Sequence, residues 1–432
     1  MIARNSMLFA ALLALGATAS DQVPGAAQDH PIVLTGGTVH TVSHGSWPGE
    51  VLFDGGRIVA VAAQVDRPEG VEVIDISGRH VYPGFISADT VMGLVEISAV
   101  RATVDTAEVG AITPEVQAEV AVNPDSEIIP VTRETGVLTV LSAPRGGLLA
   151  GSSAVLSLDG WTWEDMVVRA PAGMHVNWPR MSQAGGFGAP TPESLAESSS
   201  AAIGQLRDAF DDARAYIAGR AAGTETRTDQ RWEAMRPVIA GEVPLFVHAD
   251  SQAQIRAAVA FAREQGVRMV LVGGADAWRV AGLLAEAGIA VITRVYEVPM
   301  RRWEAYDTTF TNPAALAEAG VTFAFGSGPS GFSTPMQRGL PFEAAKAVGY
   351  GLDRDRAVRA LTLDAATILG VADRLGSLDA GKDATLFVVE GDPLEIISDV
   401  QMAWIGGRAV DLTSRHTQLY EKYQQRYQQD QE

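Results

Sequence analysis

Residues 78–91 of the chain read GRHVYPGFISADTV, and residues 374–386 read RLGSLDAGKDATL. In the first stretch, residues 81–87 form an apolar run that predicts a β-strand, and polar Asp89 follows it. The second stretch leads into the apolar run 384–390, which predicts another strand. The two stretches bracket most of the chain, and the organisation of the molecule can be worked out from them.

Short β signals lie outside this bracket at both ends of the chain. Residues 31–80 contain apolar or alternating runs separated by turn residues such as Asp54-Gly55-Gly56. Residues 384–410 repeat the pattern, with a turn at Gly406-Gly407. We expect both ends of the chain to build one small β-sandwich subdomain together.

Strand and helix signals alternate inside the bracket, which is typical of parallel βα units. Strands are predicted at 81–87, 136–142, 243–248, 268–272, 289–293 and 321–325. Helices are predicted at 194–219, 229–239, 252–265, 276–287, 313–319 and 341–350. Residues 88–135 and 143–195 have few helix signals and are expected to form loops. The alternation alone fits either a closed barrel or an open doubly wound sheet.

Together the two stretches resemble the amidohydrolase superfamily, and most of all its imidazolonepropionase-like branch. The resemblance covers most of residues 31–410. It implies an α/β fold with a (β/α)8 TIM-like barrel over residues 81–365, and a β-sandwich subdomain built from residues 31–80 and 384–410. In this family the Pro-Gly segment runs into His-x-His, the first pair of metal ligands. In this chain Asp89 and Val91 stand at those two positions.

Members of the family hydrolyse amide-like bonds with one or two divalent metals, which activate water and polarise the carbonyl. The family's strand-five histidine corresponds here to His248, whereas Gly273 and Gly328 lie near its second such histidine and its catalytic aspartate. The resemblance implies a hydrolase acting on non-peptide carbon–nitrogen bonds with an altered or lost metal site. The alternative is a catalytically inactive barrel that binds a small ligand or a partner protein.

His248 and Asp89 are the candidate catalytic residues, and they are also the candidate metal ligands. A catalytic zinc site usually has three protein ligands, so these two residues would hold at most one weakly bound divalent metal. No other cofactor is expected. The alternative for His248 is a metal-free imidazole that forms hydrogen bonds in the pocket.

Four further residues are candidates for substrate binding. Arg133 and Arg145 could each bind a substrate carboxylate through a bidentate fork, unless they pin a loop. His175 could be a second histidine at the mouth of the barrel, and nearby Trp178 could stack on a ligand ring. The alternative for Trp178 is a place in the hydrophobic core.

The composition narrows the range of partners and compartments. A formal net charge of −19 argues against nucleic acid and against anionic membranes, so a small molecule is the expected partner. The chain contains no cysteine, which excludes disulfides and thiolate metal sites. The oligomeric state stays open, and the Gln-rich tail 411–432 is expected to be helical.

The N-terminus predicts export. Arg4, a short apolar run and Ala17-Thr18-Ala19 are typical of a signal peptide over residues 1–19. No other apolar run is long enough to predict a membrane span. A periplasmic or secreted bacterial protein is the expectation.

Overall fold

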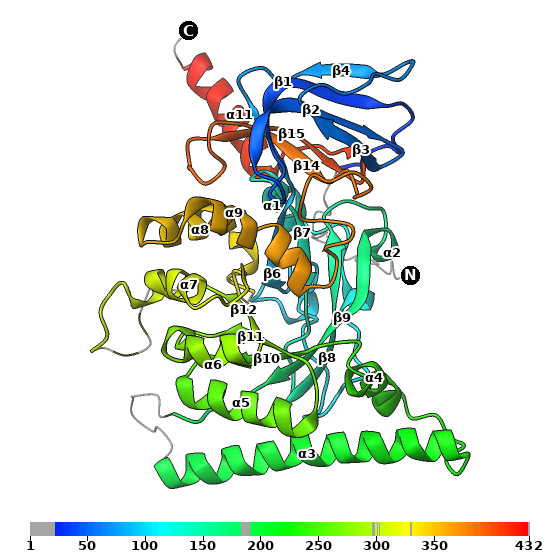
Figure 1. The fold of residues 1–432 in the computed structure, drawn as a ribbon, viewed down its shortest axis with the longest axis vertical. Helices are drawn as coiled ribbons and strands as arrows, with labels where there is room; N and C mark the ends of the chain where they lie inside the picture. Colours follow the sequence, from blue (N-terminus) through cyan, green and yellow to red (C-terminus); the bar gives the residue numbers. More distant parts are fainter. Residues whose placement is uncertain are drawn as a thin grey trace, which may run out of the picture.

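The computed structural model describes residues 22–182, 191–295, 299, 301, 303–328 and 331–430. In this part the chain forms two eight-stranded sheets, called A and B. Figure 1 shows sheet A and helix α11 (Arg415–Gln429) at one end of the molecule, and the barrel of sheet B with its helices below them.

Sheet B is a nearly closed barrel. Its strands are β6 (Phe85–Thr90), β7 (Val137–Ser142), β8 (Leu149–Ser157), β9 (Val167–Asn177), β10 (Leu245–Ala249), β11 (Met269–Gly273), β12 (Ala290–Thr293) and β13 (Phe323–Phe325). They pair in chain order from β6 to β13. The two end strands meet where the backbone N–H of Gly328, just after β13, donates to the carbonyl of Asp89 at 3.2 Å. The TIM-like barrel predicted from the sequence is confirmed.

One barrel strand departs from the (β/α)8 pattern. Strand β8 runs antiparallel to both of its neighbours, whereas the other adjacent pairs in sheet B are parallel. Residues 143–195, which we expected to be a loop, therefore contain two of the barrel strands. The small residues of β8, including Gly151 and Ser152, have low strand propensity, so its pairing depends on its neighbours.

The helices include those on the outside of the barrel strands and α11, which lies beside sheet A (Figure 1). They are α1 (Ile128–Arg133), α2 (Trp163–Met166), α3 (Pro192–Ala222), α4 (Gln230–Ile239), α5 (Gln252–Gln265), α6 (Ala281–Glu286), α7 (Thr308–Glu318), α8 (Leu340–Gly349), α9 (Arg354–Ala360), α10 (Leu363–Ile368) and α11 (Arg415–Gln429). Short 3₁₀ helices are η1 (Arg101–Thr103), η2 (Ala118–Ala121), η3 (Ala277–Val280) and η4 (Thr334–Gly339). Among the described residues, no helix combines the length and the apolar character that crossing a membrane requires.

Sheet A joins the two ends of the chain. Its strands are β1 (Ile32–His40), β2 (Ser46–Asp54), β3 (Arg57–Ala62), β4 (Glu72–Asp75), β5 (His80–Pro83), β14 (Leu386–Glu390), β15 (Asp399–Ile405) and β16 (Arg408–Ala409). Strand β5 pairs with β14, so the N-terminal and C-terminal segments share this sheet. Phe53 of β2 touches Trp404 of β15 although these strands are not neighbours, so the sheet curls around its own core.

The run 81–87, predicted as one strand, is divided between the two sheets. Strand β5 ends at Pro83 in sheet A, and β6 begins at Phe85 in the barrel. Gly84 lies between them, where an added Cβ would come within 3.0 Å of Leu138 and Thr385. The Pro-Gly step is therefore the point at which the chain passes from one sheet to the other.

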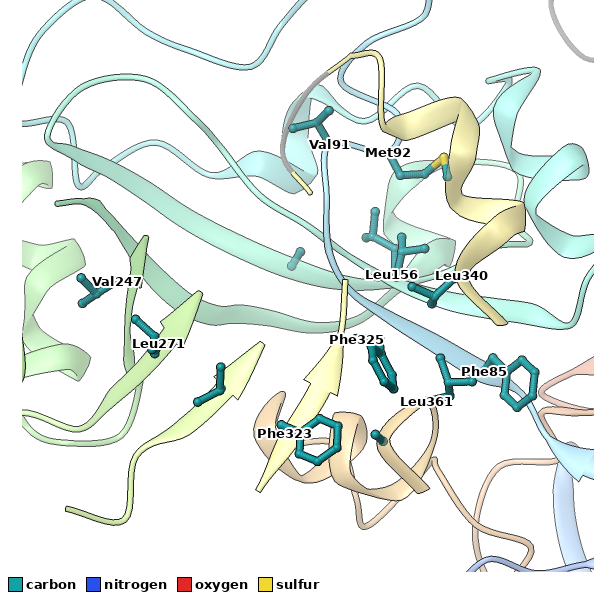
Figure 2. Packing of buried hydrophobic residues seen from close by; sticks show 14 of the residues in the cluster. Phe85, Val91, Met92, Leu156, Val247, Leu271, Phe323, Phe325, Leu340 and Leu361 are labelled. Atoms are coloured by element: carbon teal, nitrogen blue, oxygen red, sulfur yellow. The ribbon is translucent and has the colours of Figure 1, made fainter. Parts of the chain in front are cut away.

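Apolar side chains fill the barrel on both faces of its strands. Ile86, Phe246, Val272 and Ile292 belong to one buried cluster, to which α10 contributes Ala365 and Ala366. The alternate residues pack outward against the helices in a second cluster. Figure 2 shows Phe325 and Leu361 beside Phe85, where β13 approaches β6. This packing leaves the carboxyl ends of the strands to carry polar groups.

Candidate functional site

Polar side chains meet at the carboxyl ends of the barrel strands. Asp89 lies on β6, His175 on β9 and His248 on β10. Arg145 follows β7, and Arg294 comes directly after β12. Because these strand ends converge on one mouth, residues far apart in sequence are brought together there.

Asp89 is held in place by its backbone and by its carboxylate. The pairing of β6 with β7 slips between Ser87 and Thr90, and such a bulge re-aims the side chains within it. Asp89 is 1% exposed. Its carboxylate accepts a hydrogen bond from Nη2 of Arg145, which also donates to the carbonyl of Thr90 at 3.2 Å. The structure thus places Asp89 and Arg145, both predicted from the sequence, in direct contact.

His248 touches the same guanidinium from the other side. Its Nδ1 and Nε2 lie 3.3 and 3.2 Å from Nη1 of Arg145, and its Nε2 lies 2.8 Å from Nδ1 of His175. A guanidinium can only donate, so His248 must be neutral to accept a hydrogen bond from it. Strand β10 continues into α5 through a capping box of Ser251 and Gln254, which defines where the strand ends.

Burial and positive charge keep both imidazoles neutral. Burial lowers the pKa of His248 well below its usual value, and Arg145 and Arg294 act in the same direction. Burial also lowers the pKa of His175 well below its usual value, and His248 and Arg145 add to the effect. Burial lowers the pKa of Arg145 as well, although Asp89 opposes this. The centre therefore combines a carboxylate, a guanidinium and two neutral histidines.

Two glycines at the mouth leave space for charged side chains. A Cβ at Gly328 would lie 2.5 Å from Nη1 of Arg294, and a Cβ at Gly273 would lie 2.5 Å from Oδ1 of Asp250. Nη2 of Arg294 and Oδ2 of Asp250 are 3.9 Å apart and form an ion pair. Gly328 and Gly273 lie near the positions at which the family resemblance would place a catalytic aspartate and a second histidine, respectively. Sequence reasoning missed Arg294, although a charged residue at the end of the predicted strand 289–293 was the signal for it.

The residues at the mouth do not fit the metal that the resemblance implies. In the part of the chain that the structure describes, no group of three or more His, Asp or Glu residues is arranged to hold a metal ion. The guanidinium of Arg145 lies between Asp89 and His248, the two candidate ligands. A metal cation there would meet a buried positive charge at contact distance, which is strongly unfavourable.

The other two predicted substrate-binding residues are not part of this group. Arg133 is buried, donates to the carbonyl of Leu158 at 3.0 Å and forms an ion pair with Asp159 at 3.3 Å. Trp178 is buried and packs on Phe261 of α5, with ring centroids 5.5 Å apart. Its backbone N–H donates to the carbonyl of His248 at 3.1 Å. These contacts give Arg133 a loop-pinning role, and they place Trp178 in the core beside β10.

Comparisons with known proteins agree with this architecture. Residues 258–410 match the family model "Amidohydrolase family". The chain is 23% identical over 415 residues to the curated protein "Amidohydrolase tasK" of Hapsidospora irregularis. That match covers 84% of this chain and 40% of the relative, so the chain spans about two fifths of the relative's length.

Solved structures share the fold. An amidohydrolase from Thermotoga maritima MSB8 superposes with a TM-score of 0.77 at 27% identity, covering 88% of this chain and 99% of that one. Molinate hydrolase superposes with a TM-score of 0.53 at 16% identity, covering 90% of this chain and 96% of that one. At this identity the likeness concerns the fold alone. The family model and the first of these structures show that the chain is similar to amidohydrolases, in sequence over residues 258–410 and in fold over most of its length.

Proposed function

We propose that this chain is a hydrolase of the imidazolonepropionase-like branch that acts on a non-peptide carbon–nitrogen bond, an amide or cyclic amide, of a small molecule. The observation that carries the proposal is the meeting of Asp89, Arg145, His175 and His248 at the barrel mouth. The hydrolase relatives support the general reaction type. The substrate bond is inferred from the family resemblance.

Each group at the mouth has a chemical part in this proposal. Neutral His248 can accept a proton from an attacking water. The guanidinium of Arg145 can donate to a carbonyl oxygen as negative charge develops on it, or bind a substrate carboxylate. Asp89 orients Arg145 through their ion pair. Nδ1 of His175 lies 2.8 Å from Nε2 of His248, and this contact orients the His248 ring.

A panel of linear and cyclic amides tests the proposal. We expect turnover of one substrate class with or without a chelator, and a loss of about 10²- to 10⁴-fold in kcat for His248→Ala, the usual contribution of a general base. His44→Ala is the matched control, because the His44 side chain is 74% exposed and far from the mouth in sequence and fold. Full activity of His248→Ala would count against the proposed role of His248.

A second candidate function is a catalytically inactive barrel that binds a small ligand or a partner protein. The specific observation in its favour is the guanidinium of Arg145 between the two candidate metal ligands. In this case the panel shows no turnover, and a ligand raises the melting temperature of the wild-type protein but not that of Arg145→Ala. Turnover that requires His248 would exclude this candidate.

We also propose that the protein is exported and works in the periplasm or outside the cell. The support is the signal-peptide pattern of residues 1–19, which lie outside the described residues.

A further inference from the structure

The C-terminal helix α11 carries an exposed apolar stripe, which consists of Leu419, Tyr420, Tyr423 and Tyr427. These side chains are between 38% and 66% exposed, and no residue of the helix is buried. At 3.6 residues per turn the four share one face of the helix, whereas the opposite face is rich in Gln. Figure 1 shows α11 beside sheet A at the end of the molecule, with the C-terminus pointing away from the barrel.

Contacts with the rest of the chain hold the first turn of α11. Ser414 caps the helix and donates a hydrogen bond to Oε2 of Glu134 at 3.0 Å. Nη1 of Arg338 lies 2.8 Å from Nδ1 of His416. The later turns present the stripe to solvent, although a helix of 15 residues is only marginally stable in water without packing. A partner that covers the stripe would supply that packing.

The two ends of α11 offer opposite charges. Arg415 stands at the first helical position, and Arg338 adds a positive charge beside His416. Asp430 stands at the C-terminal cap, where it forms a long and exposed ion pair with Arg426 at 3.9 Å. A second α11 that runs antiparallel to the first would bring each Asp430 to the basic start of the other helix. Antiparallel helix dipoles also attract each other.

We infer that α11 is a dimerisation helix, which pairs antiparallel with α11 of a second copy of this chain through the stripe. The twofold axis passes Tyr423, so that this ring meets its own copy. In that register Tyr427 lies opposite Leu419, and Asp430 lies opposite His416 and its neighbour Arg338. A twofold interface requires a patch that is complementary to itself. The stripe, with its apolar centre and oppositely charged ends, meets this requirement.

The size of the stripe sets the strength of the dimer. Fully burying an aromatic side chain covers about 150–250 Å², so the partly exposed stripe offers roughly 300–400 Å² from each copy. A standard stable interface takes about 800 Å² from each partner. We therefore expect a reversible dimer with a dissociation constant on the order of 10⁻⁵ M.

Sedimentation equilibrium of the full chain, at concentrations below and above this value, tests the inference. We expect the mass of the wild type to rise from that of one chain toward that of two. Tyr423→Glu places two carboxylates at the axis and should weaken dimerisation about 10-fold or more. Gln425→Glu is the matched control, because it adds the same charge at an exposed position on the opposite face and should leave dimerisation unchanged.

Cross-linking tests the direction of the pair. The chain contains no cysteine, so a single introduced cysteine reports which residues meet. In the antiparallel pair the cysteines of Tyr423→Cys face each other, whereas those of Asp430→Cys lie about 21 Å apart along the helices, at 1.5 Å per residue. A short bis-maleimide should therefore cross-link Tyr423→Cys into a dimer and leave Asp430→Cys as single chains.

Three results would overturn the inference. A wild type that sediments as one chain at every concentration would mean that the stripe serves a different partner or none. A dimer that Tyr423→Glu does not weaken would place the interface elsewhere on the molecule. Efficient cross-linking of Asp430→Cys would show a parallel pair. If Tyr423→Glu does not give the circular dichroism of the wild type, Tyr423→Ser takes its place, because it removes the ring without adding charge.

Discussion

Single residues at the mouth show how burial and charge decide protonation. His175 and His248 are neutral because burial and the nearby arginines disfavour a further positive charge. His40 in sheet A is a third such case, since burial lowers its pKa to about 4. Its Nε2 lies 2.9 Å from Nδ1 of His80, and its ring stacks on Tyr82. Proton uptake by these rings is therefore coupled to unfolding.

The first prediction is that stability falls as the pH falls below about 6.5. In the unfolded chain these histidines titrate at their usual pKa, whereas in the folded chain they titrate lower, so the unfolded state binds protons first. Each such histidine can remove up to about 1.4 kcal/mol of unfolding free energy per pH unit in that range. Urea unfolding at pH 7.5 and 5.5 measures the effect.

A matched pair of variants assigns the effect to the mouth. His248→Gln should make the pH dependence shallower, because it removes one of the titrating groups. His44→Gln, at an exposed histidine, should leave it as in the wild type. Equal stability of the wild type at the two pH values would contradict this prediction.

At the scale of elements, the strand ends determine which side chains reach the mouth. Strand β13 ends at Phe325, and the chain then passes through Gly328, whose φ is 99°. A side chain is strained in this left-handed conformation, and here it would also meet Nη1 and Cδ of Arg294 at 2.5 and 2.8 Å. The glycine therefore allows both the turn and the position of Arg294.

The second prediction separates these two effects. Gly328→Ala and Gly351→Ala both place a side chain at a similar φ, 99° and 104°, but an added Cβ at Gly351 meets nothing within 4 Å. We expect Gly351→Ala to cost about 1–3 kcal/mol of unfolding free energy from the backbone alone. Gly328→Ala should cost more, because Arg294 must move. If urea unfolding gave equal losses of unfolding free energy for the two variants, Arg294 would be shown to move without a measurable cost.

At the scale of the whole molecule, sheet A and the barrel depend on both ends of the chain. Strand β14 lies between β5 and β15, and Tyr82 of β5 pairs with Phe387 of β14. Phe387 also packs edge-on against Phe85 of the barrel. Helix α11, in contrast, has no buried residue.

The third prediction compares two truncations. Removing residues 415–432 should lower the melting temperature by no more than about 3 °C, because only surface contacts such as that between Arg338 and His416 are lost. Removing residues 384–432 should give insoluble protein, because β14 to β16 and the seam with the barrel are lost. A well-folded product of the longer truncation would show that sheet A is dispensable.

The fourth prediction concerns export. N-terminal sequencing of the protein from its native host should begin at Ser20 or a few residues later, since the pattern of residues 1–19 is typical of a cleaved signal peptide. Recovery of an intact Met1 on the mature protein would contradict it.

Sequence alone determined those features that depend on local patterns. Helix α5 was predicted at its observed bounds, because its apolar spacing, its N-terminal Ser251 and its C-terminal Gly266 lie within one short segment. Strands β10 to β13 were predicted within about two residues, because each is a compact apolar run between breakers. The replacement of expected ligands by Val91, Gly273 and Gly328 was also visible from residue identity.

Only the tertiary structure decided which residues meet. Strand β8 has little strand propensity of its own and is held by its pairing with β7 and β9. Arg145 looked like a carboxylate clamp equivalent to Arg133, yet the fold places it between Asp89 and His248 and sends Arg133 to Asp159. Arg145 is 56 positions from Asp89 and 103 positions from His248 in the sequence. Such contacts depend on how the strands assemble, and local sequence patterns do not predict that assembly.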